Sequence, residues 1–247
     1  MSKPTREARL SAAFVAVADT LIADFDVVDL LHTLVENCSE ILEVDAGGIM
    51  IVDEAGQLQL VASTSEETSL VEIMQLAAGE GPCLDCFATG HSVTVADIAK
   101  SAQQWPAFSA EALRQGFNSV HATPMRLRGQ ILGTMNLFGK KATILGDEDK
   151  AVAQALADVA TIGLLQERAI RESGVFTGQL QRALNSRIII EQAKGVVSEN
   201  AGLSMHESFS ALRTYARDHN LTLGAVASSV VNRSLNVGTF APTKPRP

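Results

Sequence analysis

Cysteines are scarce and long apolar runs are missing in this chain of 247 residues, and each of these features excludes a class of protein. Three cysteines are too few, and odd in number, for the disulfide framework of a small secreted domain. No apolar run approaches the roughly 18 residues of a membrane-spanning helix. The first residues also carry no apolar stretch of the signal-peptide type. With 46% hydrophobic residues to form a core, we expect a soluble, cytoplasmic protein of one or two domains with no membrane partner.

Sequence signatures of common catalytic sites are missing as well. The chain has no P-loop, no H-E-x-x-H zinc motif and no recognisable Ser-His-Asp arrangement. Cys83 and Cys86, three residues apart in "PCLDC", offer the most covalent chemistry. Zinc would need two further ligands, and His91 and His121 lack ligand spacing. We therefore expect neither an enzyme nor a metal site. Redox sensing by the two cysteines is an alternative to a purely structural role.

The net charge of −8 is unevenly distributed. Acidic side chains outnumber basic ones in residues 1–176, whereas basic side chains are in the majority in residues 177–236. This asymmetry indicates two functions, although two solvated surfaces of different composition would show the same pattern.

The periodicity of apolar residues also changes along the chain. It predicts helices at 9–24 and 26–43, and then two β-hairpins over 46–65 and 119–140 with helices and one strand between them. From Asp147 onward the pattern is helical, beginning with a long helix. This order predicts an α+β domain followed by a small all-α domain, and composition predicts a disordered tail at 237–247.

The front half of the chain resembles a GAF domain over about residues 20–168, preceded by a helical extension at 1–19. The resemblance lies in the order of elements, in the "GEGPC" segment, and in "MRLRGQILGTMNLFGK", which looks like the family's last hairpin. It implies an antiparallel sheet with a small-ligand pocket on one face and helices on the other. The domain would act as a sensor, and its ligand or cofactor is unknown because pocket residues in this family follow no transferable motif.

Four residues of this domain are candidates for contact with a ligand or signal: Cys83, Cys86, Trp105 and His121. Trp105 precedes a proline in a loop, where it either closes a pocket or packs in the core. His121 lies on an expected strand, where it either points into a pocket or is a satisfied histidine.

The first helix of the back domain, residues 177–200, is apolar on two opposed faces. One face, which includes Ile190 and Val197, is expected to pack against two following helices that begin near Ser204 and Thr222. The opposite stripe has a spacing of four and consists of Leu180, Leu184 and Ile188. Together with the connecting helix 147–172, it is predicted to form the coiled-coil seam of a homodimer.

Between these two faces the same helix carries Arg187 and Lys194, with Gly195 beside the lysine. Gly195 removes a side chain and leaves room for a ligand to approach. Arg213 and Arg217 share a stripe on the next helix and extend this surface. Such cations suit a phosphate backbone, and they also fit an ordinary solvated face.

Residues 177–236 closely resemble the ANTAR domain, a bacterial RNA-binding antitermination module. The matching text is "SR" followed by "IEQAKG", then S-x-x-E-S-F-x-x-L-R, then N-x-x-L-x-x-V-A, with Ser208 where the family usually has alanine. The resemblance implies binding to a pair of small RNA stem-loops that overlap a terminator. It carries over the positions Arg187, Gln192, Lys194, Gly195 and Arg213.

Together the two resemblances predict a signal-responsive transcription antitermination regulator, with a helical connector at 169–176 between its domains. One alternative is a cysteine-based redox sensor or an enzyme with an RNA-binding appendage, since free methionine sulfoxide reductases share the GAF fold and use cysteines. Another is a DNA-binding helix-turn-helix built from the last two helices. Against it, the last helix offers only Arg233 for reading bases.

Overall fold

The computed structural model of the chain describes residues 5–19, 27–53, 55–127, 129–143, 145–171 and 178–240. The fold divides into two compact units: the first comprises 1–23 and 30–180, and the second comprises 24–29 and 181–247. No helix in the described ranges combines the length and apolar character needed to span a membrane.

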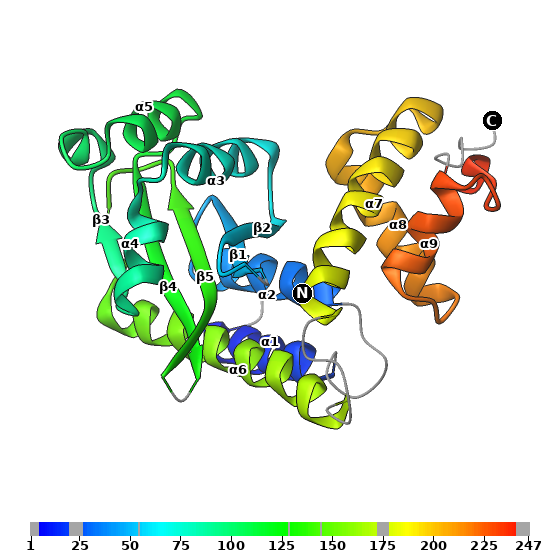
Figure 1. The fold of residues 1–247 in the computed structure, drawn as a ribbon, viewed down its shortest axis with the longest axis horizontal. Coiled ribbons are helices and arrows are strands. Elements are labelled where there is room, and N and C mark those ends of the chain that lie inside the picture. The colour runs from blue at the N-terminus through cyan, green and yellow to red at the C-terminus, as the bar shows by residue number, and fades with distance from the viewer. Residues whose placement is uncertain are drawn as a thin grey trace. The chain divides into compact units, whose positions relative to one another are not determined.

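The first unit is built around one antiparallel sheet with the strand order β2-β1-β5-β4-β3 (Figure 1). Its elements are, in chain order, α1 (Arg6–Asp19), α2 (Val27–Ile41), β1 (Ala46–Val52), β2 (Leu58–Ser63), α3 (Glu66–Ala78), α4 (Pro82–Thr89), β3 (Val93–Val95), the 3-10 helix η1 (Ile98–Ser101), α5 (Pro106–Arg114), β4 (Ser119–Leu127), β5 (Gln130–Gly139) and α6 (Asp147–Arg171). The two predicted hairpins are β1–β2 and β4–β5, so the expected α+β fold with an antiparallel sheet is confirmed.

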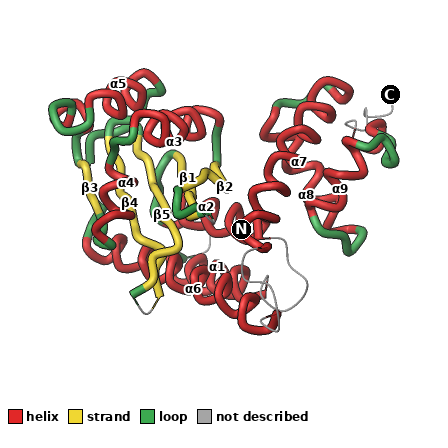
Figure 2. The backbone as a smooth tube through the Cα atoms, in the orientation of Figure 1, coloured by secondary structure: helices red, strands yellow, loops and turns green. Residues whose placement is uncertain are grey.

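Helices cover both faces of this sheet rather than one (Figure 2). The helices α3, α4 and α5 lie on one face, and α6 lies on the other, where the Gln154 amide donates to the Pro124 carbonyl oxygen at 3.1 Å. Because successive side chains of a strand point to opposite faces, Asn136 points toward α3 while its neighbour Leu137 points toward α6. The side chains of each strand are therefore divided between two helical layers, one on each face of the sheet.

The second unit is a three-helix domain, as the sequence predicts. It consists of α7 (Gly178–Ala201), α8 (Met205–Asp218) and α9 (Leu223–Val231), followed by the 3-10 helix η2 (Val237–Phe240). A capping box starts α8: the Glu207 amide donates to Ser204 Oγ at 3.2 Å, and the Ser204 amide donates to Glu207 Oε2 at 2.8 Å. The predicted apolar faces meet in a core of buried side chains: Ile190, Ala193, Val197, Phe209, Leu212, Ala216, Leu223, Val226, Ala227 and Val230.

The end of this unit differs from the expected tail. Residues 237–240 form η2, in which Phe240 is only 7% exposed and its ring centroid lies 5.4 Å from that of Tyr215. A single aromatic residue that finds a partner is enough to order a segment whose polar and small residues read as a tail. The predicted tail at 241–247, most of the connector and the end of the first predicted helix lie outside the described residues.

Candidate functional site

Helix α3 buries polar side chains and exposes apolar ones, which is the reverse of an ordinary surface helix. Glu72 and Gln75 are fully buried against the sheet, whereas Leu70, Ile73 and Met74 are 48%, 49% and 37% exposed. Gly48 of β1 makes room for the carboxyl group, since a Cβ added there would lie 2.8 Å from Glu72 Oε1. The sheet face under α3 is thus built around a charged residue.

Four side chains form what we call the buried polar cluster: Glu72, Gln75, Cys83 and Asn136. Asn136 Nδ2 donates to Glu72 Oε1 at 2.7 Å, and Gln75 Nε2 donates to Glu72 Oε2 at 2.9 Å. The Cys83 thiol donates to Glu72 Oε2 at 3.5 Å, and its backbone amide donates to Gln75 Oε1 at 3.2 Å. Every neighbour presents a donor to the carboxyl group, which is the arrangement that an ionised carboxylate requires.

Two opposing effects act on the pKa of Glu72. Burial raises it to about 7, while the hydrogen bonds from Asn136 and Cys83 lower it and so limit the rise. The carboxyl group therefore changes its charge near neutral pH inside a closed environment. Such a group is typical of a functional site as well as of a structural network.

The two cysteines of α4 are buried and poorly suited to covalent chemistry. Burial raises the pKa of the Cys83 thiol well above its ordinary value, and the nearby charge of Glu72 raises it further. Burial also raises the pKa of Cys86 to about 12. Because the thiolate is the reactive form, burial disfavours reaction at either sulfur in the folded protein. In the part of the chain that the structure describes, no group of three or more His, Cys, Asp or Glu side chains could hold a metal ion.

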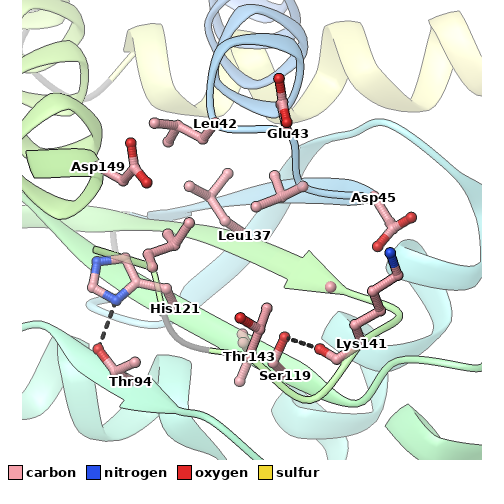
Figure 3. Close-up of a pocket in the computed structure, with 14 residues that line it drawn as sticks. Leu42, Glu43, Asp45, Thr94, Ser119, His121, Leu137, Lys141, Thr143 and Asp149 are labelled. Carbon is pink, nitrogen blue, oxygen red and sulfur yellow. Dashed lines mark hydrogen bonds between the residues drawn. The ribbon is translucent and has the colours of Figure 1, made fainter. Parts of the chain in front are cut away.

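The other two candidates of this unit lie in different places. Trp105 packs edge-on against Phe108, with ring centroids 6.3 Å apart, in the core beneath α5. His121 lines a pocket of about 350 Å³ on the opposite sheet face, where its Nδ1 lies 2.8 Å from the Thr94 hydroxyl oxygen (Figure 3).

The sequence points to His121 and Cys83 as candidate site residues but not to Glu72, Gln75 and Asn136. The periodicity of apolar residues in α3 predicts that its apolar stripe is buried and that Glu72 faces solvent, whereas the structure shows the reverse.

In the second unit, Lys194 is held in position by its neighbours. Its ammonium lies 2.9 Å from Glu191 Oε2 and 5.9 Å from the centroid of the Phe209 ring, and the side chain is only 15% exposed. Gln192 and Gly195 are exposed on α7, and a Cβ added at Gly195 would meet no atom within 4 Å. Gly195, the next residue along α7, therefore leaves open space on the helix surface.

The remaining predicted residues of this unit are distributed over α7 and α8. Arg187 is half-buried on α7, and Arg213 and Arg217 lie one turn apart on α8. Ile188 is 58% exposed. Leu180 and Leu184 belong to α7, but their side chains lie outside the described part.

The family of the chain follows from comparison with known domains. Residues 26–164 match the family model of the GAF domain. The chain belongs to the GAF domain family. Behind this GAF domain, residues 178–231 match the ANTAR domain, so the predicted order of a GAF domain followed by an ANTAR domain is confirmed.

Solved structures with a similar fold are distant in sequence. The GAF domain of a phosphoenolpyruvate-protein phosphotransferase from Coxiella burnetii aligns with a TM-score of 0.52 at 18% identity, over 67% of this chain and 98% of its own. The GAF domain of the Acinetobacter phosphoenolpyruvate-protein phosphotransferase aligns with a TM-score of 0.51 at 14% identity, over 66% of this chain and 97% of its own. Free methionine-R-sulfoxide reductase from Neisseria meningitidis aligns with a TM-score of 0.50 at 18% identity, over 69% of this chain and 96% of its own. These likenesses establish the fold alone, and no curated protein matches the chain.

Proposed function

We propose that this GAF–ANTAR protein is a signal-responsive regulator that binds paired RNA stem-loops overlapping a terminator and favours readthrough of that terminator. The observation that carries the proposal is the succession of a GAF domain at 26–164 and an ANTAR domain at 178–231 in one chain. The GAF domain senses a small molecule or another signal, and the ANTAR domain acts on the transcript. Because the target is RNA under synthesis, the protein works in the cytoplasm.

The proposed RNA surface is centred on Lys194 and Gly195. The contacts to Glu191 and Phe209 hold the Lys194 ammonium, and Gly195, the next residue along α7, leaves open space where a phosphate group can approach. Gln192 on α7 and the cations Arg187, Arg213 and Arg217 extend this surface. Tyr215, the sole tyrosine, is already stacked on His219 with ring centroids 3.9 Å apart. Recognition therefore depends on the shape and backbone of folded RNA rather than on stacked bases.

Titration of RNA across salt concentrations tests this surface. Lys194→Ala and Arg213→Ala are each expected to weaken binding of a terminator-overlapping stem-loop pair, and a lost phosphate contact lowers the salt slope by about one unit. Lys100→Ala, which removes an exposed cation from the GAF domain, serves as the control for net charge. If folded Lys194→Ala and Arg213→Ala proteins bound as tightly as the parent, this RNA surface would be wrong.

We also propose that the GAF domain is not catalytic. Its fold resembles that of the Neisseria meningitidis reductase, yet burial keeps the Cys83 and Cys86 thiols protonated. Both thiols are expected to react with a thiol reagent only as fast as the protein opens, at rates that rise strongly in denaturant. Rapid modification of the native protein, or measurable reduction of methionine sulfoxide, would support the enzyme alternative instead.

A further inference from the structure

The pocket beside His121 has no role in the function proposed so far. It lies on the α6 face of the sheet, opposite the buried polar cluster, and its volume is about 350 Å³. This is within the size range of pockets that hold small metabolites. Its wall combines the connection from α2 to β1, the strands β3, β4 and β5, and the first turn of α6 (Figure 3).

His121 supplies an unused recognition atom in this wall. The residue is only 3% exposed, and its Nε2 has no hydrogen-bond partner among the residues that the structure describes. Nδ1 is occupied by Thr94, and Nε2 is turned away from Thr94 toward the side on which Asp149 lies (Figure 3). An unpaired buried ring nitrogen is costly, so a ligand that bonds to Nε2 would remove an existing penalty.

The imidazole of His121 is uncharged at neutral pH. Burial lowers the pKa of His121 to about 4, and the nearby Lys150 ammonium lowers it as well. At neutral pH the imidazole is therefore uncharged, and Nε2 offers either one hydrogen or one lone pair. Any charge on the ligand must be matched by other groups.

Charged groups of both signs line the same pocket. Glu43, Asp45 and Asp149 contribute carboxylates, and Lys141 contributes an ammonium. Asp45 Oδ2 also accepts from the Lys140 amide at 2.6 Å, Asp149 is paired with Arg6, and Glu43 Oε1 lies 3.9 Å from the Arg9 guanidinium. Asp149 lies on the same side as His121, whereas Asp45 and Lys141 lie toward the other end (Figure 3). A ligand with charge of one sign would leave like charges facing each other, whereas a ligand with both signs can match the wall.

We propose that this pocket binds a zwitterion of amino-acid size, which forms a hydrogen bond with His121 Nε2 and places its two charges against the carboxylates and Lys141. Asp149 belongs to the first turn of α6, the helix that leads along the chain toward the ANTAR domain. Occupancy of the pocket therefore acts on the start of that helix. This sensory role rests on the proposed function, whereas ligand binding itself does not.

Thermal unfolding of the full chain without RNA tests the proposal. The probes are the twenty common amino acids, with cadaverine and glutarate as controls that carry charge of one sign. At least one amino acid is expected to raise the Tm in a saturable manner, while cadaverine and glutarate do not. No shift with any amino acid, or equal shifts with the two controls, would overturn the assignment.

Three variants then locate the binding site. His121→Phe keeps a ring but removes Nε2, and it is expected to weaken binding by about tenfold or more. His121→Gln returns a polar group at that distance and restores part of the affinity. Thr123→Val, two residues farther along β4 and outside the pocket, leaves the affinity unchanged. Unchanged affinity in a folded His121→Phe protein would overturn the site. RNA binding is measured separately, so loss of the ligand proposal would not contradict the proposed RNA-binding function.

Discussion

At the scale of single residues, Glu72 couples the stability of the GAF domain to pH. Its pKa is about 7 in the folded protein and about 4.5 in the unfolded chain, so between these values the folded state holds a proton that unfolding releases. The free energy of unfolding therefore falls as the pH rises through this window. The loss is on the order of 3 kcal/mol by pH 8, because each pKa unit corresponds to about 1.4 kcal/mol.

Glu72→Gln isolates this effect. The amide does not titrate, so the variant is expected to lose less stability than the parent between pH 5 and pH 8, whatever its stability at either end. Urea unfolding at a series of pH values measures the difference. Glu66→Gln, on the exposed first turn of the same helix, is the control and keeps the parent profile. Parallel profiles for the parent and Glu72→Gln would show that this carboxyl group titrates normally.

At the scale of elements, the capping box of α8 anchors the helix that contributes Phe209 and Arg213. Ser204→Ala removes the acceptor for the Glu207 amide and is expected to cost about 1 kcal/mol. Hydrogen exchange of the first-turn amides of α8 reports this loss locally, without assuming that the two domains unfold together. Ser210→Ala, exposed in the middle of α8, is the control and leaves exchange unchanged or slightly slower. Equal exchange in both variants would contradict the role of the cap.

Within α7, the ion pair between Glu191 and Lys194 competes with the proposed RNA contact. Such a pair contributes roughly 0.2–0.5 kcal/mol, so RNA must displace Glu191 at a small cost. Glu191→Gln is expected to raise RNA affinity by about twofold.

Glu199→Gln removes a negative charge from an exposed position farther along α7 and controls for long-range attraction. Filter binding or fluorescence titration at fixed salt compares the two variants. Equal gains would mean that release of Lys194 contributes nothing.

The elements themselves follow from periodicity, because the hairpins, the capping box and the faces of α7 each rest on local chemistry. The site does not. The inversion of α3 depends on Gly48, which is distant in sequence and leaves room for the Glu72 carboxyl group. The pocket at His121 depends on the pairing of β3 with β4, which brings Thr94 to the histidine ring. Contacts of this kind arise only when the sheet assembles, so residue spacing cannot reveal them.

At the scale of the whole molecule, the second apolar face of α7 points to self-association. Within its own unit α7 buries Ile190, Ala193 and Val197, while Ile188 on another side stays 58% exposed. Full burial of such an aliphatic side chain stabilises a protein by roughly 1.5–3 kcal/mol relative to full exposure. A coiled coil that pairs two copies of the chain through Leu180, Leu184 and Ile188 would gain the part of this free energy that Ile188 lacks within its own unit. We therefore propose that the protein is a homodimer with its seam along α6 and this stripe.

Ile188→Asp is expected to shift the protein from dimer to monomer, because it places a carboxylate in the proposed apolar seam. Light scattering or sedimentation over a range of protein concentrations measures the mass. Leu221→Asp alters another half-exposed aliphatic residue of the same unit, outside the stripe, and should leave the mass unchanged. A folded Ile188→Asp protein with the parent's mass at every concentration would show that this stripe is not the seam. A monomeric parent would contradict the proposed homodimer.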